Sequence, residues 1–362
     1  MNSPLPWQGA VSWLWSVVGR VGSECLLCYL RLAVRGHHSV SMSMLGFGVA
    51  GQRDGIMMTV TAHDSSFHDL IRPAARLTVH GTGYGYAEGP VWHPVEQYLV
   101  FSDIIGSTRH VYVPGEDVQQ VRDLTNNANG LTLDRDLNLV ICEHGTSTLV
   151  RERPEGTREV LASHFEGSEL NSPNDVVVRR DGTIYFSDPD YGRTAPGFGP
   201  PRDCPLGFRG VYRLSGEGEL VLCVERDRYG QPNGLCFSPD ESLLYINDSP
   251  NALIDVYEVA ADGSLSGRRR LVAGIGDGDM TKGIPDGMKC DERGNIWVTG
   301  PGGVWVFSPE GTHLGTVHVP EVVGNLHWGG PDWRTLFIPS TTSLYSIPVT
   351  VGPHREPFMD VS

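Results

Sequence analysis

The sequence has little positive charge. Its 28 Lys and Arg residues stand against 43 Asp and Glu residues, which gives a formal net charge of -15 at pH 7. Binding to nucleic-acid phosphates or to an anionic membrane surface needs a basic face, so this balance argues against both kinds of partner. The charge is compatible with a soluble protein and with a site for a cation.

Cysteine is also scarce, with seven residues at irregular spacing. A chain of 362 residues is too large to need disulfide staples, so we expect mostly reduced thiols and a cytoplasmic location. Cys25 and Cys28 form a C-x-x-C pair, but no second pair or histidine ligand lies near it. A zinc or redox site is therefore disfavoured there.

The first part of the chain lacks the regular pattern that follows. Charged residues interrupt the apolar run Ala10–Val34, which makes it a poor membrane span, and no positive charge precedes it as in a signal peptide. We expect a disordered or weakly helical extension over residues 1–60, a regular domain over 61–352 and a tail over 353–362. We also hypothesise that the functional chain starts near Met57–Met58, which mass spectrometry of the native N-terminus would test.

Six segments of the regular region can be laid over one another. Each begins with an oxygen-bearing residue, passes through a short apolar strand and a polar turn, and continues into a second β-rich strand. The intervals between them leave room for two further strands each time. The first residues of the six segments are Glu88, Asn129, Asn174, Asn233, Asp286 and Asn325.

A hairpin that recurs in this way is typical of a propeller blade. Outer strands are expected at Gly210–Leu214, Ile254–Val259 and Gly303–Phe307. No long helical period interrupts the pattern, a β-helix would need shorter repeats, and a sandwich would not keep the phase. We therefore predict an all-β fold, a six-bladed β-propeller with four-stranded blades, whose last blade is completed by strand material from residues 75–87.

The first position of the repeat predicts a ring around the propeller axis, because the innermost strand of each blade lines the central channel. All six residues there carry a side-chain oxygen, and Glu88 and Asp286 are carboxylates. An Asn-Gly or Asp-Gly pair taken alone is as consistent with a turn, but Glu is a poor turn former and all six are in register. Such oxygens suit a hard divalent cation, with Ca²⁺ first, Mg²⁺ or Mn²⁺ as alternatives and Zn²⁺ less favoured.

The residues around this ring also form a series of short motifs. In their number and order they resemble the gluconolactonase family, which includes regucalcin (senescence marker protein) and, more distantly, diisopropyl-fluorophosphatase. The resemblance covers about residues 80–348. The matching stretches are Ala87-Glu88-Gly89-Pro90-Val91-Trp92, Asn129-Gly130-Leu131-Thr132-Leu133-Asp134, Cys142-Glu143-His144-Gly145, Ser172-Pro173-Asn174-Asp175-Val176, Phe186-Ser187-Asp188-Pro189 with Tyr191-Gly192, Pro232-Asn233-Gly234-Leu235, Ile284-Pro285-Asp286-Gly287 and Gly329-Gly330-Pro331-Asp332.

The resemblance implies a propeller enzyme that opens a small sugar lactone, such as gluconolactone, with a catalytic divalent cation. In this family the metal is held by the Glu of E-G-P, the Asn of P-N-D, the Asn of P-N-G and the Asp of P-D-G. These motifs fall on Glu88, Asn174, Asn233 and Asp286. The resemblance also places Asn129, of the N-G-L motif, nearer the substrate. The last blade departs from the family at His327 and at Trp333, where a plain apolar residue and Gly are more usual.

Asp286 is the candidate general base, since a carboxylate at the metal can hold a water beside the lactone carbonyl. Hydroxide at the metal is the alternative nucleophile, and no G-x-S-x-G elbow occurs. His144, Tyr191 and Arg193 are candidate substrate-binding residues, although a surface loop is equally consistent for His144. The segment 193–209, rich in Gly and Pro, is either a lid or an ordinary insertion.

Two other functions remain open at this point. One is a phosphotriester or ester hydrolase that uses the same site, and the other is a non-catalytic propeller that buffers calcium or binds protein partners. The oxygen-bearing ring argues against the second, because an interaction propeller has no use for two carboxylates on its axis. The sequence indicates neither the natural lactone nor the oligomeric state.

Overall fold

The structure is a computed structural model and describes residues 59–360. Contacts divide the chain into two units, Met1–Met57 and Met58–Ser362, and all described residues belong to the second. The expectations for residues 1–60 and for a start near Met57–Met58 therefore lie outside the described residues, apart from positions 59 and 60. No helix within the described part is long and apolar enough to cross a membrane.

Six sheets of four or five strands run outward from a central axis. The first two blades are β3 (Ala87–His93), β4 (Tyr98–Asp103), β5 (Thr108–Tyr112) and β6 (Gln119–Arg122), then β7 (Ala128–Leu133), β8 (Leu139–Glu143), β9 (Thr148–Glu152) and β10 (Arg158–Ala162). The third and fourth are β13 (Val176–Val178), β14 (Ile184–Asp188), β15 (Gly210–Leu214) and β16 (Leu220–Leu222), then β17 (Pro232–Phe237), β18 (Leu243–Asp248), β19 (Leu253–Val259) and β20 (Leu265–Ala273).

The last two blades recruit strands from the start of the described region. The fifth blade is β21 (Met288–Cys290), β22 (Ile296–Gly300), β23 (Gly303–Phe307) and β24 (His313–His318), with β1 (Val60–Ala62) added outside; the sixth is β25 (His327–Gly329), β26 (Thr335–Pro339), β27 (Ser343–Pro348) and β2 (Thr78–Thr82). The remaining elements are the hairpin β11 (His164–Phe165) and β12 (Ser168–Glu169), the helix α2 (Tyr191–Thr194), and the 3₁₀ turns η1 (Ser65–Asp69) and η2 (Pro357–Asp360).

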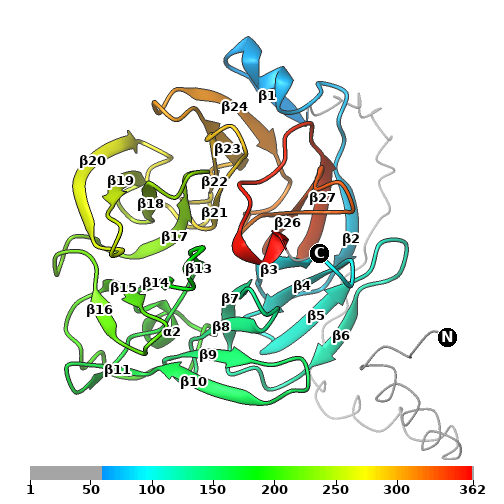
Figure 1. The fold of residues 1–362 in the computed structure, drawn as a ribbon. Coiled ribbons are helices and arrows are strands. Elements are labelled where there is room, and N and C mark those ends of the chain that lie inside the picture. Colours follow the sequence, from blue (N-terminus) through cyan, green and yellow to red (C-terminus); the bar gives the residue numbers. More distant parts are fainter. Residues whose placement is uncertain (1–58, 361–362) are drawn as a thin grey trace, which may run out of the picture. The chain divides into compact units, whose positions relative to one another are not determined.

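The blades follow one another around the axis in chain order (Figure 1). Inner strand β25 contacts inner strand β3, which closes the ring, and β2 pairs with β27 to complete the last blade. The all-β prediction, a six-bladed β-propeller with four-stranded blades and closure by residues 75–87, is confirmed. Two predicted outer strands coincide with β15 and β23, and the third, β19, begins one residue earlier than predicted.

The inner strands are buried along their whole length, as every residue of β7 and β17 illustrates. Neighbouring blades cover both faces of each sheet, and apolar side chains fill the space between them. Trp297 of β22 and Trp328 of β25, for example, meet edge to face with ring centroids 5.4 Å apart. Such a pair contributes about 0.5–1.5 kcal/mol beyond the burial of its surface.

Glycines follow several ring residues because the inner strands approach one another closely there. Gly130 lies within β7 and Gly234 within β17, so neither is in a turn. A Cβ at Gly130 would lie 2.4 Å from the carbonyl oxygen of Asn174, and a Cβ at Gly234 would lie 2.1 Å from that of Asp286. Both glycine N–H groups donate to those same carbonyls, which ties each blade to the next at the axis.

Carboxylates at the ends of second strands fix the loops that lead into the ring. Asp103, at the end of β4, accepts the backbone N–H groups of Gly85 and Tyr86 at 2.9 and 3.0 Å. Asp188 and Asp248 do the same in the third and fourth blades, each toward two successive N–H groups of the loop before β13 or β17. These bonds hold the chain in place just before Glu88, Asn174 and Asn233.

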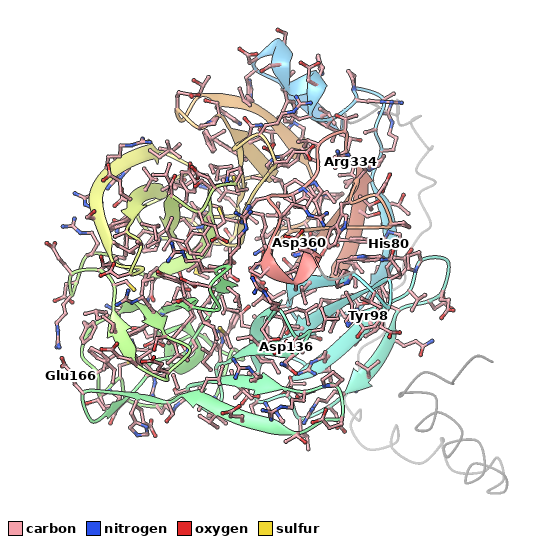
Figure 2. All side chains as sticks on the ribbon, in the orientation of Figure 1. His80, Tyr98, Asp136, Glu166, Arg334 and Asp360 are labelled. Carbon is pink, nitrogen blue, oxygen red and sulfur yellow. The ribbon has the colours of Figure 1, made fainter. Side chains whose placement is uncertain are left out.

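Residues 353–360, expected as a tail, pack onto the propeller. Pro353 forms a β-bridge with Asp291, and Phe358 is fully buried against inner strands of the first two blades. Asp360, labelled in Figure 2, marks the turn η2 toward the middle of the ring. This segment lines a hollow of about 370 Å³ that lies further along the inner strands than the predicted ring and includes Lys289 and Glu356.

Candidate active site

A second hollow, of about 290 Å³ including space open to solvent, lies where the inner strands begin. Five of the six predicted ring residues line it: Glu88, Asn129, Asn174, Asn233 and Asp286. The structure thus brings together the four predicted metal ligands and the first predicted substrate-binding residue. We take this hollow as the site, because the other one lacks this set of oxygens.

Glu88 lies on β3 and is 2% exposed. Its Oε2 accepts a hydrogen bond from Asn325 Nδ2 at 2.9 Å and another from the N–H of Gly89. Burial raises the pKa of Glu88 well above its usual value, and the nearby carboxylates of Asp286 and Asp175 add to the shift. The sixth ring residue, Asn325, therefore positions Glu88 and does not line the hollow itself.

Asp286 lies just before β21 and is held from its backbone. Its N–H donates to Thr299 Oγ1 at 2.7 Å, and that hydroxyl donates onward to the carbonyl of Ile284 at 2.8 Å. Asp286 Oδ2 lies 3.4 Å from the hydroxyl of Tyr86, which donates to it. Burial, reinforced by the charge of Asp175, raises the pKa of Asp286 to about 7 in the absence of a cation.

The two amide ligands predicted for the metal are also fixed. Asn233 Nδ2 donates to Ser249 Oγ at 3.1 Å, and Ser249 Oγ donates to the carbonyl of Pro285 at 2.6 Å. Asn233 Oδ1 is buried without a hydrogen-bond partner. Asn174, 4% exposed, is held by its N–H, which donates to the carbonyl of Ser187 at 2.9 Å.

These features fit a divalent cation. No Lys or Arg lines the hollow, and neither Glu88 nor Asp286 forms a salt bridge within residues 59–360. Two buried carboxylates without a positive partner and an unpartnered amide oxygen form the kind of oxygen-rich set that Ca²⁺ prefers. The described residues contain no cluster of three or more His, Cys, Asp or Glu side chains that could hold a metal ion, so amide oxygens would have to complete the ligand set.

The three remaining predicted substrate-binding residues differ in position. Tyr191, at the start of α2, lines the hollow, and burial raises the pKa of its hydroxyl, which stays protonated and able to donate. His144 is fully buried and lies behind Asn129, with its Nε2 3.2 Å from Asn129 Nδ2. Arg193 is 3% exposed, and neither it nor His144 lines the hollow.

Arg193 is occupied by the protein itself. Its guanidinium donates to the carbonyls of Asn171 and Leu170, each at 2.6 Å, and to Ser147 Oγ and the carboxylate of Glu169, each at 2.9 Å. A guanidinium has five N–H donors, so these contacts leave little capacity for a ligand. Arg193 therefore links α2 to the segment before β13 and to the second blade, and its position does not place it in contact with a substrate.

Five further residues line the hollow that sequence reasoning did not single out: Tyr86, Ile104, Phe198, Met280 and Ile284. Tyr86 and Ile284 each stand two positions before a ring carboxylate, and the period of two in extended chain was a usable signal for them. Phe198 and Met280 lie in irregular segments after α2 and before β21, where no pattern identifies them. They give the hollow an apolar wall above an oxygen-rich floor.

A six-bladed propeller with an acidic and amide floor at one end of its channel defines a class of proteins with a small-molecule site on the axis. A model of the SMP-30/Gluconolactonase/LRE-like region matches residues 86–342. The chain belongs to this family, and the resemblance read from the sequence motifs is confirmed.

Relatives with curated names support this assignment. A gluconolactonase of Zymomonas mobilis is 30% identical over 308 residues, covering 80% of this chain and 85% of its own length. The pentonolactonase XacC of Haloferax volcanii is 31% identical over 261 residues, covering 69% and 80%. Among solved structures, a gluconolactonase of Xanthomonas campestris is 32% identical with a TM-score of 0.73, covering 80% of this chain and 94% of that one.

Proposed function

We propose that this protein hydrolyses a small sugar lactone with the help of one divalent cation held by Glu88, Asn174, Asn233 and Asp286. Ca²⁺ is the first candidate for the cation, and Mg²⁺, Mn²⁺ or Zn²⁺ are the alternatives. The observation that carries the proposal is the convergence of these four side chains on one hollow without any positive partner. Support for the substrate class comes from relatives named as gluconolactonase and pentonolactonase.

A bound divalent cation would polarise the lactone carbonyl and stabilise negative charge on its oxygen. Asp286 would accept a proton from the attacking water. The Tyr86 hydroxyl donates to its Oδ2 and helps to orient this carboxylate. The bond between the acyl carbon and the ring oxygen then breaks, and the ring oxygen takes up a proton to give the open hydroxy acid.

The hollow also suits this substrate class in polarity. The amide of Asn129 and the hydroxyl of Tyr191 can hydrogen-bond sugar hydroxyls, and Phe198 can pack against the carbon face of the ring. Because the lining has no Lys or Arg, we expect a neutral lactone to be preferred over a phosphorylated one.

Neither a phosphotriester or ester hydrolase nor a non-catalytic propeller has specific support from the described residues. The decisive experiment is gluconolactone hydrolysis before and after chelation, with Ca²⁺, Mg²⁺, Mn²⁺ and Zn²⁺ added back one at a time. Glu88→Gln should be inactive with every ion. The matched control is Asp136→Asn, an exposed carboxylate outside the hollow (Figure 2), which should keep the wild-type rate. Full activity after complete chelation would refute the metal dependence.

A further inference from the structure

Hydrogen bonds hold the segment after α2 over one side of the hollow. Arg202 donates to the carbonyl of His144 and to Ser147 Oγ, each at 2.6 Å. Phe198 lies in the sequence between α2 and Arg202. It lines the hollow and packs against Tyr86 with ring centroids 5.1 Å apart. The segment around Phe198 thus forms a fixed wall that depends on contacts with the second blade.

His144 lies at the junction between this wall and the floor of the hollow. It follows β8 directly and is completely buried. One ring nitrogen, Nδ1, lies 3.1 Å from the carbonyl oxygen of Phe198 in the wall. The other, Nε2, lies 3.2 Å from Nδ2 of Asn129 in the floor.

The chemistry of these two partners fixes the proton on the ring. A carbonyl oxygen can only accept a hydrogen bond, so Nδ1 of His144 must carry the hydrogen. A neutral imidazole then has a lone pair on Nε2, which accepts from the amide nitrogen of Asn129. Burial lowers the pKa of His144 to about 4, which keeps the ring neutral near pH 7. The amide nitrogen of Asn129 is thereby held toward His144, and its Oδ1 stays available to the hollow.

We propose that His144 is a positioning residue that joins the Phe198 wall to the Asn129 floor through its two ring nitrogens. Its first role is to fix which atom of Asn129 faces the substrate. Its second role is to hold the wall in place relative to Asn129 through the hydrogen bond to the Phe198 carbonyl. The kinetic consequence rests on the proposed lactonase function, whereas the tautomer and the anchoring of the wall do not.

The residues around the His144 ring are closely packed. A Cβ on Gly192 would lie 2.5 Å from the Cβ of His144, so this neighbour must be glycine for the ring to fit. Arg202 is the charged group that faces it, and its positive charge also disfavours an imidazolium. A histidine placed this way cannot reach a ligand in the hollow, because Asn129 and Phe198 stand between them.

Two substitutions separate the two contacts. His144→Asn places an amide near the Nδ1 position, so it keeps the donor to Phe198 and loses the acceptor for Asn129. His144→Gln places its amide near the Nε2 position, so it keeps the acceptor and loses the donor. We expect His144→Asn to lower kcat about tenfold with the wall intact, and His144→Gln to raise KM several-fold with kcat nearly unchanged. His164→Gln, on the exposed β11, is the control and should behave as wild type.

Two measurements need no lactonase activity. Amide hydrogen exchange over residues 195–202 should accelerate in His144→Gln and stay at the wild-type rate in His144→Asn. The ¹⁵N signals of wild-type His144, identified by their loss in His144→Asn, should report the tautomer with hydrogen on Nδ1. A hydrogen on Nε2, or the same exchange change in both variants, would overturn the proposal even in an active enzyme. The expected tautomer and exchange pattern with no lactone hydrolysis would instead reject only the proposed function.

Discussion

The floor and the wall of the hollow are built in different ways. The floor comes from one repeat position, so its residues are set by inner strands that are buried, bonded to their neighbours and held by carboxylates at the second-strand ends. The wall comes from irregular segments that differ from blade to blade, with Phe198 and half-exposed Met280 among its residues. The contrast suggests that the floor carries the chemistry and the wall selects the substrate.

The largest effect should come from the floor. Asp286→Asn removes both a ligand and the proposed base, and we expect kcat/KM to fall at least about 10³-fold. In chelator at pH 8 the same variant should be more stable than wild type by roughly 2–4 kcal/mol. The raised pKa, about 7, means that ionising the buried carboxylate opposes folding, increasingly so as pH rises from about 4 to 7.

Steady-state kinetics and denaturant unfolding in chelator check this pair of effects. A variant that retains most of the activity would assign the chemistry to another group. An unchanged unfolding free energy would mean that the buried carboxylates are neutralised by something other than a cation.

A substitution that removes support from the floor should give the next largest effect. Asn325 Nδ2 donates to Glu88 Oε2 at 2.9 Å without lining the hollow. Asn325→Ala should weaken Ca²⁺ binding about 10- to 100-fold, because outer-shell partners orient the ligands of a metal. Calorimetric titration with Ca²⁺ measures it, and equal affinity in variant and wild type would remove Asn325 from the site.

The wall should give a smaller effect of a different kind. Phe198→Ala removes an aromatic face from the hollow, and we expect KM for gluconolactone to rise about five- to tenfold while kcat changes little. Val160→Ala, an exposed apolar residue on β10, serves as the control. If Phe198→Ala lowers kcat as strongly as a floor substitution, the division between chemistry and selection does not hold.

The last effect concerns the junction of the two regions and is confined to acid pH. The pKa of His144 is lowered from 6.5 to about 4, so the neutral ring stabilises the fold above pH 6.5, and this contribution is lost as pH falls toward 4. The wild-type unfolding free energy should therefore fall more steeply over that interval than that of His144→Gln, by up to about 3 kcal/mol. Parallel curves for the two proteins would contradict the buried, neutral state of His144.

The floor could be predicted from the sequence because residues at the same position of each repeat lie at equivalent places around the propeller axis. Glu88, Asn174, Asn233 and Asp286 could be aligned before any coordinates, and they meet in one hollow. What register could not reveal was the role of each glycine. A turn and a close approach of two strands both favour Gly, and Gly130 belongs to the second case.

The wall and the hydrogen bonds that hold it were less predictable, because their positions depend on loops that lack the repeating sequence pattern of the strands. Arg193 was expected at the substrate, yet its donors are used by carbonyls and a carboxylate of the segment before β13. His144 was expected either at the mouth of the site or in a surface loop, but it is completely buried behind Asn129, which follows from the conformation of the segment that carries Phe198.

The most direct test is a crystal grown with Mn²⁺ as a substitute and examined by anomalous diffraction. We predict a single strong peak at the floor of the hollow, within about 2.1–2.6 Å of oxygens from Glu88, Asn174, Asn233 and Asp286. An empty floor at saturating Mn²⁺, or a peak only elsewhere on the chain, would contradict the claim that these four side chains converge on one cation.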